Sequence, residues 1–189
     1  MADAFTGAIL RRANVRDIAP MLRLINAYAS ERIMLPRTEF EMAENIRDFV
    51  VAFSGNTLAG CGALHFYSPS SAEIRSLAVD PARKSGGLGR AIVEALEQEA
   101  RENELESIFA FTYVPGFFRK LGFDEVERGE FPLKAWKDCL KCPKFQCCDE
   151  IAMLKTLRPV GVRGRATDGF ALFYSTRLSG LVQLPALKR

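Results

Sequence analysis

The chain has 189 residues, 48% of them hydrophobic, a length that suits one domain burying about two-thirds of its unfolded surface. Its 26 lysines and arginines against 23 aspartates and glutamates leave a net charge of only +3, which argues against a nucleic-acid partner. The sequence has no run of about eighteen apolar residues and no basic stretch followed by an apolar core. We therefore expect no membrane partner and a cytoplasmic location.

The first third of the chain predicts strands at both ends and two helices between them. Residues 14–17 supply helix caps, and the helix after them has the apolar positions Ile18, Met21, Leu22, Leu24, Ile25 and Tyr28. Thr38 followed three residues later by Glu41 forms a capping box, which predicts a helix over 39–46. The strands expected here lie at 8–12, 48–53 and 58–67.

A glycine-rich turn between a strand and a helix is the most informative stretch of the sequence. The strand, 72–79, ends before Pro81, which cannot pair within a sheet. The first turn of any helix has amide donors without internal partners and a positive dipole end. The turn therefore predicts a phosphate site, with tight packing alone as the alternative. The helix after it has the apolar stripe Leu88, Ile92, Ala95, Leu96 and Ala100.

Two common nucleotide-binding patterns are absent from this turn. No GK[ST] sequence follows the glycines, as the Walker pattern requires. The glycines also do not follow the strict GxGxxG spacing of dinucleotide-binding folds. Nucleotide hydrolysis and dinucleotide binding are therefore disfavoured.

The second half of the chain predicts shorter elements, which complete a mixed α/β order. They are strands at 107–113, 123–126 and 151–157, and a short helix at 115–120.

Two signatures in the sequence resemble the GCN5-related N-acetyltransferase (GNAT) superfamily. Residues 84–90, KSGGLGR, follow LAVDP and resemble its acetyl-CoA loop, with Lys84 where glutamine or arginine is usual. Residues 117–123, FFRKLGF, resemble its second signature. The resemblance covers residues 8–157 and implies an α/β GNAT fold, in which a mixed, mostly antiparallel central sheet is flanked by helices. Residues 158–189 are expected to form a loosely ordered C-terminal tail.

The resemblance implies that acetyl-CoA is the co-substrate. The strand backbone at Leu77, Ala78 and Val79 is expected to hold the pantetheine arm. The pyrophosphate is expected to bind backbone amides of the loop and helix start, namely Lys84, Ser85, Gly86, Gly87, Leu88, Gly89 and Arg90.

Further segments resemble one branch of the superfamily, the amino-acid N-acetyltransferases in the short, stand-alone form of N-acetylglutamate synthases. These segments are LPRT at 35–38, CGAL at 61–64 and IAM at 151–153. The implied reaction is acetyl transfer from acetyl-CoA to the α-amine of L-glutamate, in arginine biosynthesis. An acidic amino acid is therefore the expected second partner.

Two arginines are candidates for binding the carboxylates of the acceptor. Arg37 lies in the segment that covers the acceptor site in the family, and a guanidinium pairs bidentately with a carboxylate. Arg75, on the central strand, is the second candidate, and a strand arginine in a salt bridge is its alternative role.

Glu73 and Tyr113 are the candidates for proton transfer. On a strand, Glu73 shares a face with Arg75 and Leu77, so it could act as a base through water or simply pair with Arg75. Many GNAT enzymes have a tyrosine acid in the second signature where this chain has Phe118. Tyr113 is a substitute for that acid, and a buried tyrosine satisfied by backbone is the alternative.

Four cysteines are concentrated in one short segment, as Cys139, Cys142, Cys147 and Cys148. A CxxC pair followed by two further cysteines allows a zinc site, although the spacer is short and adjacent cysteines rarely both bind one ion. We expect no metal and reduced thiols, with zinc as the alternative.

Two other functions stay open at the level of sequence. The chain could acetylate another amine, such as a different amino acid or a polyamine, or could be an acyl-CoA-binding module without turnover. A homodimer is also left open.

Overall fold

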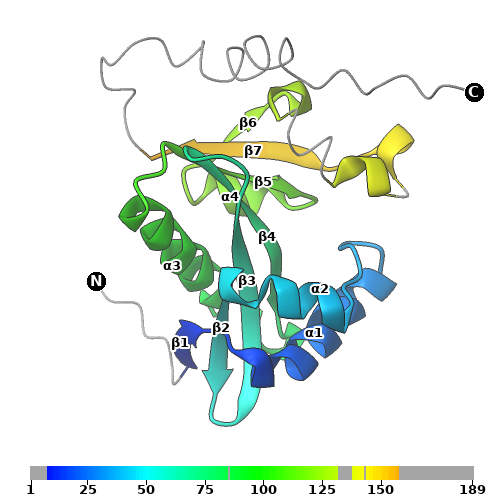
Figure 1. The fold of residues 1–189 in the computed structure, drawn as a ribbon, viewed down its shortest axis with the longest axis vertical. Coiled ribbons are helices and arrows are strands. Elements are labelled where there is room, and N and C mark those ends of the chain that lie inside the picture. Colours follow the sequence, from blue (N-terminus) through cyan, green and yellow to red (C-terminus); the bar gives the residue numbers. More distant parts are fainter. Residues whose placement is uncertain (1–7, 85, 132–137, 143, 158–189) are drawn as a thin grey trace, which may run out of the picture. The chain divides into compact units, whose positions relative to one another are not determined.

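The computed structural model describes residues 8–84, 86–131, 138–142 and 144–157. Within them, seven strands form one sheet in the order β1-β2-β3-β4-β5-β7-β6, with helices against it (Figure 1). The strands are β1 (Ala8–Arg12), β2 (Phe49–Ser54), β3 (Thr57–Phe66), β4 (Ser71–Val79), β5 (Ser107–Thr112), β6 (Asp124–Val126) and β7 (Ile151–Thr156). The α-helices are α1 (Ile18–Ser30), α2 (Glu39–Glu44), α3 (Leu88–Glu102) and α4 (Pro115–Arg119).

The sheet is mixed and mostly antiparallel, as the resemblance implied. Every neighbouring pair of strands is antiparallel except β4 and β5, which are parallel. The chain crosses between these two strands through α3, which is the usual connection between parallel neighbours. The predicted fold class is therefore confirmed.

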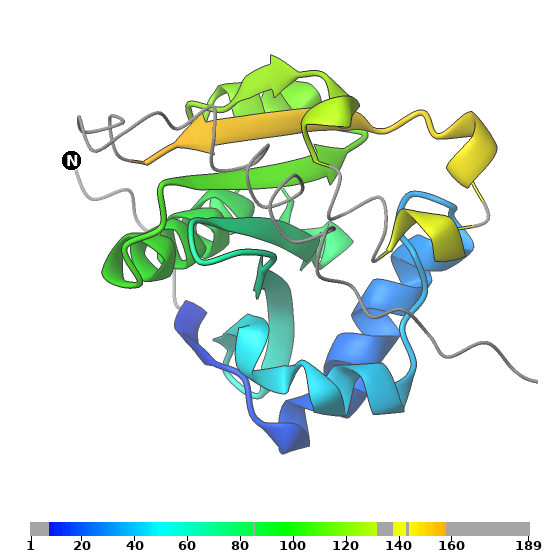
Figure 2. The same ribbon diagram turned by 45° about the horizontal axis from the view of Figure 1, so that its top comes forward.

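Helix α3 packs on one face of the sheet through the apolar stripe that the sequence predicted. Ile92, Leu96 and Ala100 are fully buried in the larger core, whereas Arg90, Glu94 and Arg101 are exposed. Glycine on β3 allows this close approach, because a Cβ at Gly62 would lie only 2.9 Å from Ile92 Cγ2. The helix therefore sits against the central strands (Figure 2), and at its start a Cβ at Gly89 would lie 3.6 Å from Val79 Cγ2 at the end of β4.

Helices α1 and α2 cover the opposite face, where Met21, Ile25 and Met42 form a second core with β2 and β3. The predicted capping box is present, since the Thr38 hydroxyl accepts from the Glu41 amide and the Glu41 carboxylate accepts from the Thr38 amide. Helix α2 is shorter than predicted, because the chain tightens into a 3-10 helix at Ile46–Asp48 before β2 begins.

Short 3-10 helices, which the sequence patterns did not predict, connect several of these elements. They are Val15–Asp17, Ile46–Asp48, Pro81–Arg83, Arg128–Glu130, Cys139–Lys141 and Phe145–Cys147. None of the helices in the described part of the chain is long and apolar enough to cross a membrane. The predicted tail at 158–189 lies outside the described residues, so the domain boundary at 157 stays a prediction.

Candidate active site

Strands β4 and β5 separate after a short paired section. They pair only over residues 71–73 and 107–109, although both strands continue beyond these residues. The backbone edges that face each other further along do not pair with one another, and an extended ligand can bind such an edge as an added strand would. The predicted donor-binding residues Leu77, Ala78 and Val79 lie on this part of β4.

One backbone group of this segment already has a partner. The Val79 carbonyl accepts a hydrogen bond of 2.5 Å from the hydroxyl of Tyr28, a buried residue of α1. This bond ties α1 to the end of β4. A pantetheine arm would therefore be held by other backbone groups of the segment.

The start of α3 has the features of an anion site. Gly87 precedes the helix with a φ of +79°, in the left-handed region that favours glycine, and no side chain caps the helix. The Ala91 amide donates to the Gly87 carbonyl, so the amides of Leu88, Gly89 and Arg90 come before the first bond within the helix. Together with the helix dipole, they suit a phosphate group.

The side chains around this helix start leave it accessible. Lys84 and Gly86 are exposed, and the Lys84 ammonium lies 5.0 Å from the ring centre of Tyr28. A Cβ at Gly89 would lie 3.5 Å from Phe117 of α4, so the second signature packs beside the first. Ser85 lies outside the described residues.

Arg37 is held on the other side of β4 by a backbone clamp. Asn26 of α1 accepts from the Arg37 amide at 2.9 Å and donates to the Arg37 carbonyl at 3.0 Å. The half-buried side chain makes one long hydrogen bond, from Nη2 to the Ser76 hydroxyl at 3.4 Å. Burial, and next the charge of Arg75, lower the pKa of the Arg37 guanidinium.

Arg75 lies beside Arg37, and the polar side-chain atoms found around its guanidinium group are all 3.3 Å or more away. Its side chain is 12% exposed, and Nη2 lies 3.3 Å from Asn45 Oδ1 and 3.9 Å from Asp48 Oδ2. Nη1 lies 3.6 Å from Asp138 Oδ2. Its Nε is buried without a hydrogen-bond partner among the described residues. Two guanidinium groups with spare donors thus lie together, as a site for carboxylates requires.

A β-bulge in β4 keeps Ser76 on the side of Arg37 and shows that the face predicted for Leu77 was wrong. The β3–β4 register shifts between Cys61 and Ala63, which pair with Ala78 and Arg75. Ser76, in the bulge, has a φ of +53°. Strict alternation would put Leu77 on the same face as Arg75, but Leu77 packs toward α3 near Gly62. The extra residue keeps Ser76 on the Arg37 side and turns Leu77 to the opposite face.

Glu73 lies near Arg37 and Arg75 and is buried, with 2% of its surface exposed. The Tyr67 hydroxyl donates to Glu73 Oε2 at 3.1 Å and also contacts Asp138 Oδ2. Sequence reasoning missed Tyr67 and Asp138. They come from segments far apart in the chain, and neither belongs to a motif that marks it.

Tyr113 follows β5, and within the described residues its hydroxyl bonds side chains rather than the backbone partner of the alternative role. Its half-buried hydroxyl donates to Asp149 Oδ1 at 2.7 Å and accepts from Lys144 Nζ at 2.8 Å. The pKa of Tyr113 is raised: burial raises it most, the hydrogen bond from Lys144 lowers it, and the hydrogen bond to Asp149 raises it. Phe118, where many family members have the acid, is buried in the core.

The cysteine segment gives no support to the zinc alternative. None of Cys139, Cys142, Cys147 and Cys148 forms a disulfide. Across the part of the chain that the structure describes, no group of three or more histidine, cysteine, aspartate or glutamate side chains is arranged to hold a metal ion.

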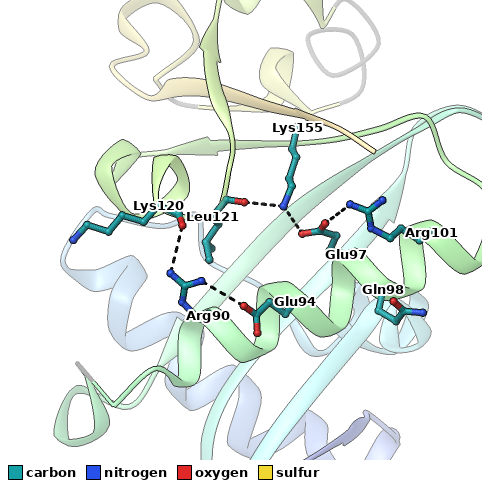
Figure 3. A pocket seen from close by; sticks show the side chains of 8 residues that line it. All are labelled: Arg90, Glu94, Glu97, Gln98, Arg101, Lys120, Leu121 and Lys155. Atoms are coloured by element: carbon teal, nitrogen blue, oxygen red, sulfur yellow. Dashed lines mark hydrogen bonds and ion pairs between the residues drawn. The ribbon is translucent and has the colours of Figure 1, made fainter. Parts of the chain in front are cut away.

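A polar groove of about 350 Å³ lies along α3, and Lys120, Leu121 and Lys155 line its other side (Figure 3). Three of its four cations form ion pairs: Arg101 and Lys155 both pair with Glu97, and Arg90 pairs with Glu94. One of these ion pairs, Glu97–Lys155, joins α3 to β7, and the other two lie within α3. Of the predicted site residues, only Arg90 lines this groove.

The chain belongs to the acetyltransferase (GNAT) family, whose model matches residues 18–123. The matched residues include both signatures, strands β4 and β5 and the start of α3. The chain is accordingly an acetyl-CoA-dependent N-acetyltransferase, which favours an enzyme over a binding module without turnover.

Individual relatives and solved structures show which acetyltransferases this chain is similar to. "Uncharacterized N-acetyltransferase CT2212" from Chlorobaculum tepidum is 43% identical over 148 residues, covering 78% of this chain and 96% of that protein. An "Amino-acid acetyltransferase" from Mycobacterium tuberculosis is 37% identical over 122 residues, or 63% of this chain and 70% of the relative. The structure of Rv2747 from M. tuberculosis, in complex with CoA and NLQ, matches with a TM-score of 0.70 at 30% identity, covering 79% of this chain and 99% of that one.

Proposed function

We propose that this N-acetyltransferase transfers acetyl to the α-amine of an acidic amino acid, with L-glutamate as the acceptor, in arginine biosynthesis. The observation that carries the proposal is the pair Arg37 and Arg75. Both side chains are at least half-buried, neighbouring and cationic, and the hydrogen bonds and ion pairs found for them are 3.3 Å or longer. A dicarboxylate would supply two anions to two incompletely paired cations.

The name of the M. tuberculosis relative, an amino-acid acetyltransferase, agrees with this class of acceptor. The two arginines add the preference for an acidic member of the class, because a guanidinium pairs bidentately with a carboxylate but not with a carboxamide.

The acetyl donor binds on the other side of β4 in this proposal. The amides of Leu88, Gly89 and Arg90 bind the pyrophosphate, and the backbone beyond residue 73 holds the pantetheine arm along the opening between β4 and β5. Lys84, Gly86 and Gly87 form the approach to this helix start, and Ser85 stays a predicted donor-binding residue. The thioester carbon then meets the acceptor amine where the two sites join at the β4 bulge.

The chemistry needs a base for the amine, and Glu73 is our candidate. The ammonium gives a proton to Glu73, directly or through water, and the amine nitrogen then forms a bond to the acetyl carbon. The C–S bond breaks and leaves a thiolate, the nitrogen loses its second proton as the amide forms, and that proton passes through solvent to the thiolate, while Glu73 releases its own proton to solvent. The raised pKa of Tyr113 makes it a weak acid toward a thiolate whose conjugate thiol has a pKa of about 8.5. Tyr113 is therefore a proton donor of secondary importance.

A thiol-release assay tests the proposal. The purified chain is incubated with acetyl-CoA and a panel of L-glutamate, L-glutamine, L-aspartate, other amino acids and polyamines. L-Glutamine matters most, because it replaces one carboxylate by an amide of the same shape. We expect the highest kcat/KM with L-glutamate, and a higher value for L-glutamine or a polyamine would refute the acidic acceptor.

A further inference from the structure

Helix α2 connects the two candidate arginines of the acceptor site. Arg37 directly precedes Thr38, whose side chain caps the start of the helix. Asn45 is the cap residue at the other end, and its Oδ1 atom accepts a hydrogen bond of 3.3 Å from Arg75 Nη2. A helix of six residues therefore joins the backbone of one arginine to the side chain of the other.

The side chain of Asn45 is oriented by two different partners. Its Nδ2 atom donates to the Glu41 carbonyl of α2 at 2.7 Å, and its Oδ1 atom accepts from Arg75. A carbonyl can only accept and a guanidinium can only donate, so one orientation of the amide group satisfies both. The half-buried Asn45 thus links the last turn of α2 to the Arg75 guanidinium.

The turn after α2 brings a second oxygen to the same nitrogen of Arg75. In the 3-10 helix Ile46–Asp48, the Asp48 amide donates to the Asn45 carbonyl at 3.0 Å. Asp48 Oδ2 lies 3.9 Å from Arg75 Nη2, but only 2.6 Å from His65 Nδ1 on β3. Asn45 is therefore the nearer partner of Arg75 in this turn.

This nearer partner is a neutral amide. An amide oxygen orients a guanidinium group without cancelling its charge, whereas a carboxylate does both. The carboxylates around Arg75, those of Asp48 and Asp138, lie farther away, at 3.9 and 3.6 Å. A group that is already oriented also loses less rotamer freedom when it binds a ligand. Arg75 is thus oriented by Asn45 and keeps its charge for an anion.

We propose that Asn45 is a positioning residue that sets the length of the dicarboxylate that the acceptor site takes. Asn45 fixes the Arg75 guanidinium, the clamp by Asn26 fixes the Arg37 backbone, and α2 is the spacer between them. Two carboxylates that bind two fixed cations must match their separation, so one methylene more or fewer weakens one pair. The inference rests on the proposed function, because it takes Arg37 and Arg75 as the carboxylate-binding groups.

The experiment measures thiol release by Asn45→Ala with three acceptors of increasing length, L-aspartate, L-glutamate and L-2-aminoadipate. The KM for L-glutamate should rise about fivefold, through loss of one hydrogen bond that orients Arg75. The preference in kcat/KM for L-glutamate over the other two acceptors should fall at least threefold. The KM for acetyl-CoA should stay within about twofold, because α2 and the start of α3 lie on opposite faces of the sheet.

A matched variant separates this role from helix capping. Asn103 makes the same bond at the end of α3, where its Nδ2 atom donates to the Glu99 carbonyl at 2.9 Å. Asn103→Ala loses that capping bond on the opposite face of the sheet and should change no KM and no acceptor preference.

A double-mutant cycle tests whether Asn45 acts through Arg75. Arg75→Lys keeps a positive charge but loses the planar guanidinium fork that Asn45 orients. In this background, Asn45→Ala should raise the KM for L-glutamate by less than about twofold, compared with about fivefold in the wild-type background.

The inference would be overturned by an Asn45→Ala variant with unchanged KM and acceptor preference, by the same changes in Asn103→Ala, or by equal effects in both backgrounds. A different result of the acceptor panel is distinguishable from these. If another amino acid ranks above L-glutamate, the choice of acceptor has failed. The same cycle with that amino acid then decides whether Asn45 positions Arg75.

Discussion

Replacing Arg37 with methionine tests the acceptor site most directly, because it removes the charge but keeps most of the side-chain stem. The fold should lose little, since the side chain's one hydrogen bond is long, at 3.4 Å to Ser76. We expect the free energy of unfolding to stay within about 1 kcal/mol and the Tm within about 4 °C for a chain of this size.

The effect on the acceptor should be much larger. A charge-assisted pair between a half-buried guanidinium and a carboxylate contributes about 2–3 kcal/mol, and each 1.4 kcal/mol corresponds to about a tenfold change. The KM for L-glutamate should therefore rise about 30- to 100-fold, whereas the KM for acetyl-CoA should stay within about twofold, because Arg37 lies on the opposite side of β4 from the helix start.

Steady-state thiol release with each substrate varied in turn, together with thermal unfolding, provides both measurements. Arg23→Met, an exposed arginine on α1, is the matched control and should change neither KM value. Parallel increases in both KM values, or a Tm loss beyond 4 °C, would show that Arg37 supports the structure rather than the acceptor, and would refute the reasoning.

Three other changes test separate parts of the molecule. Gly89→Val should weaken CoA binding about tenfold or more by calorimetry, because the two valine methyl groups extend from a Cβ that already lies 3.5 Å from Phe117. Gly89→Ala adds only that Cβ and should bind CoA normally. An unchanged CoA affinity of Gly89→Val would contradict the helix-start site. Tyr113→Phe should lower kcat less than about tenfold, and a loss above about a hundredfold would make Tyr113 the essential acid. Asp17→Asn should destabilise the fold by about 1 kcal/mol at pH 7, because Arg11 lowers the pKa of Asp17 through hydrogen bonds of 2.7 and 2.8 Å. This contribution is present above the unfolded pKa of about 4 and is lost as the pH falls through the folded value. A difference in denaturant midpoints that does not shrink as the pH is lowered below about 4 would be inconsistent with it.

Most of the fold could be predicted because its signals are local. The apolar spacing along α3, the capping box at Thr38 and the turn residues between strands each act within a few positions. The bulge at Ser76 could not be predicted. Nothing in the strand's own sequence requires an extra residue, and its register depends on pairing with β3. The predicted face of Leu77 was wrong for this reason.

The candidate site likewise contains residues that the sequence predicted and residues that it could not predict. Lys84 to Arg90 and Arg37 lie in segments that resemble family motifs, so sequence alone identified them. Tyr67 and Asp138 are joined by a contact between residues 71 positions apart. No periodicity or spacing relates such residues, because the contact exists only after the segment beyond β6 has folded back over β4.

The short pairing of β4 with β5 also affects the mechanics of the enzyme. In the described part of the chain, β4 and β5 pair in register over only three residues of each strand, and beside these pairs Glu106 and Ser107 donate to the Ser70 carbonyl. A donor bound along this seam would act as a missing strand and link both halves. Saturating CoA, at a hundred times its Kd, would add about 2.7 kcal/mol to stability. The cosubstrate would thus complete the scaffold on which the acceptor is positioned, which favours donor binding before acceptor binding.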